Sequence, residues 1–115
     1  MVAYWDFDAP RTPETRRDTS GTAIAAAALL KVAASDPGAP RSRGYRDVAE
    51  RTIRALIEWH LTPTSSSDTR PIGLLTDGCF DPKNGVATQN ELIWGDYFLL
   101  ESLCVLTGRL PADAI

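Results

Sequence analysis

Between residues 18 and 30 the chain reads Asp18-Thr19-Ser20-Gly21-Thr22-Ala23-Ile24-Ala25-Ala26-Ala27-Ala28-Leu29-Leu30. Alanine has the highest helix propensity, and the first three residues are good N-caps because their side chains accept bonds from free backbone N–H groups. We therefore predict a helix from about residue 19 or 20 to about residue 34, ended by Asp36-Pro37-Gly38. A helix that is small and apolar on most sides is normally buried on most sides.

Apolar periodicity predicts two further helices. The second spans about residues 45–60, and its apolar positions recur every three or four residues: Val48, Ala49, Ile53, Leu56, Ile57 and Leu61. The third spans about residues 92–107, ends at Gly108 and has two apolar stripes: Ile93, Tyr97, Leu100 and Cys104 on one side, and Leu99, Leu103 and Leu106 on the other. The chain is thus predicted to be all-α.

These three helices have more apolar surface than they can bury against one another. The first and third are apolar over most of their circumference, and only the second is clearly amphipathic. Exposed apolar surface costs roughly 25 cal/mol per Å². We therefore expect partners to cover it, either further helices of a larger domain or another chain.

The remaining segments are predicted to be irregular. Pro10 and Pro13 oppose a helix in the first 18 residues. The polar run 64–69 indicates a flexible loop at about residues 62–71, and residues 72–75 could form a short strand. Residues 81–85 are typical of a turn, in which Asn84-Gly85 supplies left-handed geometry.

Composition excludes some classes of protein. A chain of 115 residues suffices for one domain, and its net charge of -3 does not favour nucleic acid. No stretch of about 20 apolar residues could span a membrane. The start lacks a signal peptide, which slightly favours the cytoplasm. One cluster of arginines is either the solvated face of a helix or an anion-attracting rim: Arg41, Arg43, Arg46, Arg51 and Arg54.

Three segments, in this order and spacing, resemble the C-terminal part of the unsaturated glucuronyl hydrolases, also called glycoside hydrolase family 88. They are Tyr4-Trp5-Asp6-Phe7-Asp8-Ala9-Pro10, Arg17-Asp18-Thr19-Ser20-Gly21-Thr22-Ala23-Ile24-Ala25 and Leu92-Ile93-Trp94-Gly95-Asp96-Tyr97-Phe98-Leu99-Leu100-Glu101-Ser102-Leu103. The resemblance implies that residues 1–115 form a single partial domain, a C-terminal helical-hairpin portion of an (α/α)6 barrel of the six-hairpin glycosidase type. The predicted first and third helices would be inner helices, and the second an outer one.

The resemblance also implies a reaction. Enzymes of this family release a 4,5-unsaturated uronic acid from oligosaccharides left by polysaccharide lyases. An aspartic acid protonates the double bond, water adds at C5, and the resulting hemiketal opens. Their catalytic aspartates precede everything matched here, so no catalytic residue is carried over, and neither a metal nor a cofactor is implied. Four aspartates match motif positions but not the proton donor: Asp6, Asp8, Asp18 and Asp96.

Two residues are candidates for contact with substrate. Trp5 lies in an irregular segment before an inner helix, where its ring could stack on a sugar or simply pack between helices. In relatives that act on sulfated glycosaminoglycans, the loop matching residues 77–85 carries serines and a lysine that hold sulfate. Lys83 matches that lysine, but the serines are absent and Asp81 is acidic, so sulfate preference is in doubt. Lys83 could equally be an ordinary exposed turn residue.

Other residues receive a structural interpretation. Trp59 and Trp94 are expected to pack in the core or in grooves. We interpret His60, the only histidine, as a surface or capping residue at the end of the second helix. Cys79 and Cys104 are too few and too far apart to indicate a metal site, and a disulfide between them stays open.

Rival interpretations stay open as well. The chain starts inside a family motif, so we expect a truncated piece that is inactive alone. It could instead be a fragment of an unsaturated rhamnogalacturonyl hydrolase on the same scaffold. It could also be a non-enzymatic helical module that binds sugars or another protein.

Overall fold

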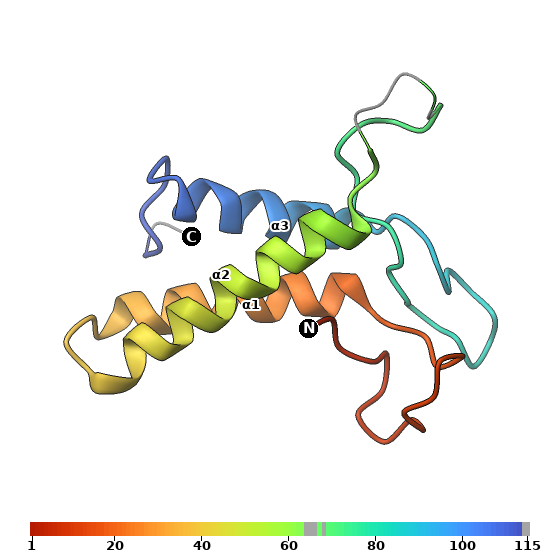
Figure 1. The fold of residues 1–115 in the computed structure, drawn as a ribbon, viewed down its shortest axis with the longest axis horizontal. Coiled ribbons are helices and arrows are strands. Elements are labelled where there is room, and N and C mark those ends of the chain that lie inside the picture. The colour runs from red at the N-terminus through yellow and green to blue at the C-terminus, as the bar shows by residue number, and fades with distance from the viewer. Residues whose placement is uncertain (64–66, 68, 114–115) are drawn as a thin grey trace.

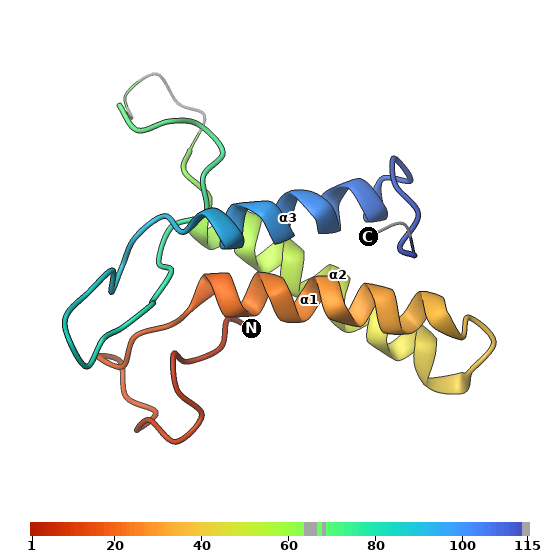
Figure 2. The ribbon, with the colours of Figure 1, turned by 180° about the vertical axis from the view of Figure 1, so that it is seen from behind.

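The computed structural model describes residues 1–63, 67 and 69–113. Within them the chain forms three helices, α1 (Thr19–Ser35), α2 (Pro40–His60) and α3 (Ile93–Leu106), and no strand beyond isolated bridges. α1 and α3 start at the same end of the molecule and run side by side, while α2 runs back in the opposite direction (Figure 1; Figure 2). The prediction of an all-α chain is confirmed.

α1 has the bounds and the cap that its sequence predicts. It begins at Thr19 and ends at Ser35, one residue beyond the expected end. The Asp18 side chain caps it by accepting from the backbone N–H groups of Ser20 and Gly21. One side of α1 is buried, with Ala23 and Ala26 in the core. The other side is exposed at Ile24, Ala25 and Ala28, so the expectation that this helix is buried on most sides is wrong.

α2 begins earlier than the apolar pattern indicates. We expected it from about residue 45, but it starts at Pro40, because proline is well suited to the first helical position, where its missing N–H costs nothing. Ser42 fixes this start, since its hydroxyl donates to the Asp36 carbonyl at 2.5 Å. Farther along, Ile53 and Leu56 are fully buried in the core.

α3 buries only one of its two apolar stripes. Leu99 is buried, and Leu103 and Leu106 pack against the core. On the other stripe, Ile93 is 77% exposed and Leu100 63% exposed. The shortage of packing partners expected from the sequence is therefore visible on this helix.

Several local expectations are wrong. Residues 72–75 form no strand: Ile72 and Gly73 lie in a turn, with Gly73 at a φ of 81°, and only Leu75 forms a bridge, to Leu61. Trp59 is not packed but 72% exposed. Trp94, by contrast, is 37% exposed and packs beside Phe80, with the ring centroids 5.7 Å apart.

The remaining expectations have mixed outcomes. Both cysteines are free thiols. The flexible loop expected at about residues 62–71 falls partly on residues 64–66 and 68, which lie outside the described residues. In the described part of the chain, no helix has both the length and the apolar character needed to cross a bilayer.

Candidate functional site

Two irregular segments meet at the end of the molecule where α1 starts. One is the N-terminal segment, and the other is the connection from α2 to α3 (Figure 1). The two candidate residues, Trp5 and Lys83, lie on these two segments. What holds the segments together therefore determines the geometry of the candidate site.

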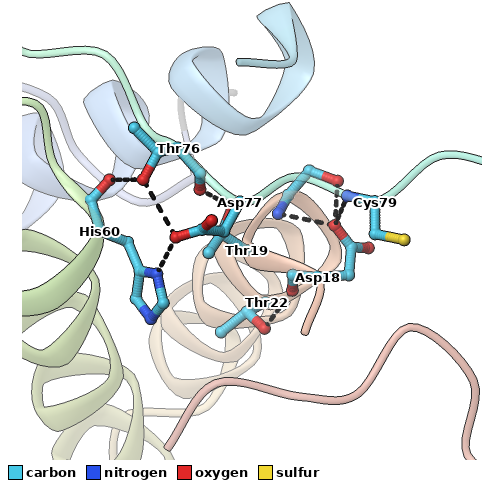
Figure 3. A network of polar contacts seen from close by, with 8 residues as sticks. Asp18, Thr19, Thr22, His60, Thr76, Asp77 and Cys79 are labelled. Atoms are coloured by element: carbon cyan, nitrogen blue, oxygen red, sulfur yellow. Dashed lines mark hydrogen bonds and ion pairs between the residues drawn. The ribbon is translucent and has the colours of Figure 1, made fainter. Parts of the chain in front are cut away.

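Asp18 lies at the junction of these segments (Figure 3). Its Oδ1 accepts from the Ser20 N–H at 3.0 Å and from the Ser20 hydroxyl at 2.6 Å, and Oδ2 accepts from the Gly21 N–H at 3.0 Å. Oδ1 also accepts from the backbone N–H of Cys79 at 3.2 Å, which lies on the connection between α2 and α3. The sequence predicted the cap but gave no sign of the bond to Cys79.

The N-terminal segment is bound to the same turn of α1. The Asp18 N–H donates to the Ala3 carbonyl at 3.0 Å, and the Ala3 N–H donates to Thr22 Oγ1 at 3.0 Å. Arg17 adds a bond from its guanidinium to the Val2 carbonyl and lies 3.8 Å from the centroid of the Tyr4 ring. These contacts fix the backbone immediately before Trp5.

Lys83 lies at the tip of a hairpin-like loop, which we call the 78–90 loop. Gly78 and Asn90 exchange backbone hydrogen bonds at 2.9 and 3.0 Å and close its base. At its tip, the Asn84 side chain and backbone N–H donate to the Asp81 carboxylate, and these bonds lower the pKa of Asp81. Gly85 follows with a φ of 68°, so the turn and its left-handed glycine are confirmed.

The structure brings the two candidate residues together. Lys83 Nζ lies 5.9 Å from the centroid of the Trp5 ring, within reach of a cation–π interaction. Lys83 is exposed and Trp5 half-buried. Trp5 also lines an open pocket of about 350 Å³, together with Tyr4, Phe7, Thr22, Leu29 and other residues of the N-terminal segment, α1 and α2. An aromatic face beside a cation can contact the apolar face and an anionic group of one sugar.

A second polar pair lies on the other side of α1. His60 Nδ1 is 2.8 Å from Asp77 Oδ2, which also accepts from the Thr76 hydroxyl at 3.1 Å (Figure 3). Asp77 has a φ of 60°, in the left-handed region that a non-glycine residue adopts at a cost. His60 thus ends α2 as expected, but the sequence did not reveal its partner. No local sequence pattern predicts that an aspartate after an apolar run adopts a left-handed backbone conformation and faces a distant histidine.

The remaining motif aspartates have structural partners. Asp96, in the first turn of α3, accepts from the Leu75 N–H at 2.6 Å, and Asp6 accepts from the Asp8 N–H at 2.9 Å. Asp96 therefore ties the start of α3 to the connection before it. Across the described ranges, no group of three His, Cys, Asp or Glu side chains could hold a metal ion.

Comparison with known proteins gives one consistent result. The chain is 34% identical, over 103 residues, to the unsaturated glucuronyl hydrolase of Bacillus sp. (strain GL1), a match that covers 89% of this chain and 26% of the relative. It is 32% identical, over 105 residues, to the unsaturated chondroitin disaccharide hydrolase of Streptococcus pyogenes serotype M1, covering 90% of this chain and 25% of the relative. No family model matches the sequence.

Solved structures agree with the sequences. The crystal structure of the Bacillus sp. GL1 hydrolase superposes with a TM-score of 0.82 at 32% identity, over 91% of this chain and 27% of that one. A mutant of the Streptococcus agalactiae hydrolase complexed with dGlcA-GalNAc6S superposes with a TM-score of 0.76 at 30% identity, over 89% of this chain and 26% of that one. The three helices match the helical (α/α)6 barrel fold of these neighbours.

The chain spans about a quarter of the length of the curated relatives that it matches. Because the match covers about nine-tenths of the chain, it includes α1, α2, most of α3 and the 78–90 loop. In sequence and in fold, the chain is a relative of the unsaturated glucuronyl hydrolases.

Proposed function

We propose that this chain is the C-terminal part of an unsaturated glucuronyl hydrolase, one partial domain that completes the helical barrel and contributes Trp5 and Lys83 to the sugar-binding cleft. The whole protein would release a 4,5-unsaturated uronic acid from lyase-generated oligosaccharides. An aspartic acid outside this chain would protonate the double bond, water would add at C5, and the hemiketal would open. The names of the relatives, which include an unsaturated chondroitin disaccharide hydrolase, support this substrate class.

The observation that carries this proposal is the contact between Lys83 and Trp5. A sugar ring can stack on the indole face while its carboxylate pairs with the ammonium, so two weak contacts act on one ligand. Asp81 lies two positions from Lys83, and its carboxylate reduces the local positive field. We therefore expect the site to prefer unsulfated over sulfated sugars.

The exposed stripe of α3 supports the proposal that this chain is one part of a larger helical barrel. Ile93, Tyr97 and Leu100 are each more than half exposed on one side of the helix. Removing such side chains from water is favourable, at roughly 25 cal/mol per Å². We propose that the remaining barrel helices, or another chain that supplies them, cover this stripe. The isolated chain would then lack both a covered core and a proton donor.

The experiment follows the enoate absorbance of an unsaturated chondroitin disaccharide incubated with the isolated chain, while binding is followed in parallel by tryptophan fluorescence. We expect no loss of absorbance and weak, Lys83-dependent binding. Turnover by the isolated chain would refute the absence of a proton donor. Stronger binding of a pectin-derived than of a glycosaminoglycan-derived disaccharide would favour the rhamnogalacturonyl alternative. Tight binding by a stable, monodisperse chain would favour the non-enzymatic module.

A further inference from the structure

We infer that Asp18 is a positioning residue of the proposed sugar site, because it holds the 78–90 loop against the segment that carries Trp5. This inference rests on the proposed function for its biological meaning, but the geometry behind it does not. It assigns Asp18 a role beyond that of a helix cap.

The number and direction of its bonds exceed what a cap requires. A cap of α1 only has to accept hydrogen bonds from the first free backbone N–H groups, and Asp18 does this for Ser20 and Gly21. The further bond, from Cys79 N–H to Oδ1, connects residues 61 positions apart and leads directly into the 78–90 loop. Cys79 is buried, so its N–H would lack water as a substitute partner.

The opposite side of Asp18 holds the other segment. Its backbone N–H donates to the Ala3 carbonyl, and its own carbonyl accepts from the hydroxyl of Thr22, which in turn accepts from the Ala3 N–H. Trp5 follows two residues after Ala3, and Lys83 four residues after Cys79. One residue thus sets the relative position of the two backbones from which the candidate side chains extend.

Gly21 leaves the space that the carboxylate occupies. A Cβ added at Gly21 would lie 2.7 Å from Asp18 Oδ2, closer than real contacts allow. Gly21 is in an ordinary helical conformation, so alanine would raise helix propensity at this position while displacing the carboxylate. Gly21→Ala would therefore stabilise α1 but weaken the bond that Asp18 makes to the 78–90 loop.

The test compares Asp18→Ser with Asp18→Asn in a Cys104→Ser background, in which Cys79 is the one cysteine left. Serine is as good an N-cap as asparagine, but its hydroxyl is too short to bond both the helix and Cys79. Asparagine keeps a carbonyl oxygen at the right reach. Burial, and then the charge of Asp18, raise the pKa of the Cys79 thiol. Both variants remove that charge, so it cancels in the comparison.

We expect Cys79 in Asp18→Ser to react with an aromatic disulfide reagent about tenfold faster than in Asp18→Asn, the factor typical of leaving one buried N–H without its hydrogen-bond partner. Helix content by circular dichroism should be equal in the two. Lys83 should attract iodide to the Trp5 ring and so enhance its quenching. With Trp59 and Trp94 replaced by phenylalanine, this enhancement should be lost in Asp18→Ser and retained in Asp18→Asn. A cap alone would move neither signal.

Equal Cys79 rates and equal Trp5 quenching in the two variants would overturn the inference and leave Asp18 as a cap. If Asp18→Ser does not fold, Gly21→Ala decides. A faster Cys79 rate with unchanged or increased helix content supports the tether, and an unchanged rate contradicts it. These measurements need no sugar. If the tether is found but no unsaturated disaccharide binds, the proposed function fails and the positioning of the loop by Asp18 stands.

Discussion

Lys83 Nζ lies 5.9 Å from the centroid of the Trp5 ring, although the two residues are 78 positions apart in the chain. The 78–90 loop, closed at its base by Gly78 and Asn90, brings the ammonium to this position. Trp5 and Lys83, which the sequence indicates as separate candidates, therefore form one local site with an aromatic face and a positive charge.

This contact predicts how Trp5 responds to charged quenchers. In a chain where Trp59 and Trp94 are phenylalanine, Lys83→Met should lower quenching of Trp5 by iodide about threefold at low salt. Two unit charges about 6 Å apart in water interact by about 0.7 kcal/mol, which corresponds to that factor. Quenching by neutral acrylamide should be unchanged. Arg41→Met removes the same charge from the exposed start of α2, at the other end of the molecule (Figure 1), and is the matched control; an equal effect of both substitutions would contradict the contact.

The turn that carries Lys83 should open in acid. The bonds from Asn84 lower the pKa of Asp81 below its ordinary value of 3.8. Because the pKa of Asp81 is lowered in the folded chain, the bonds between Asn84 and Asp81 stabilise the turn fully above pH 3.8. This stabilisation is lost as the pH falls through the folded-state pKa. The amide resonance of Asn84 should therefore shift below pH 3.8 in the native chain but stay constant in Asp81→Asn. A pH-independent Asn84 resonance in the native chain would rule out this turn.

The base of the 78–90 loop should be intolerant of added volume. A Cβ at Gly78 would lie 2.7 Å from Leu92 Cδ1 and 2.9 Å from the Asn90 carbonyl oxygen, whereas one at Gly44 on α2 meets nothing within 4 Å. Gly78→Ala should lower the free energy of unfolding by about 1–3 kcal/mol, as overpacking does. Gly44→Ala should raise it by about 1 kcal/mol, because alanine is the better helix former. Equal effects in urea titrations would show that the loop base is not tightly packed.

The ion pair between α1 and α3 should matter more than one on the surface. Lys31 Nζ is 2.9 Å from Glu101 Oε1, and the side chains of Lys31 and Glu101 are 34% and 4% exposed. Apart from this ion pair, neither Glu101 carboxylate oxygen has a hydrogen-bond partner among the described residues, so Lys31 is the main compensation for a buried charge. Lys31→Met should destabilise the chain by about 1–3 kcal/mol, less than for a fully buried pair because Lys31 is partly solvated.

The exposed pair Arg54–Glu50 on α2 provides the control. Arg54→Met should leave the unfolding midpoint unchanged within error, because solvent screens that pair. A Lys31→Met midpoint that also stays unchanged would mean that Glu101 is stabilised in another way.

Local signals in the sequence accounted for the helices but not for the contacts between loops. The alanine run and the Asp18 cap predicted α1 almost to the residue, since propensity and capping act within a few positions. The start of α2 was missed because Arg41, Arg43 and Gly44 show no apolar period, although Pro40 was a usable signal. The bonds Cys79–Asp18 and His60–Asp77 join distant positions, and tertiary packing alone brings those partners together.

The most direct test of the central claim is to replace the matching quarter of the Bacillus sp. GL1 hydrolase by this chain and to follow the enoate absorbance of an unsaturated disaccharide. We predict no turnover by the isolated chain, none by the relative lacking that quarter, and restored turnover by the chimera, reduced by Lys83→Met. A chimera that folds with native helix content but never consumes the enoate would contradict the claim that this chain supplies part of such a hydrolase.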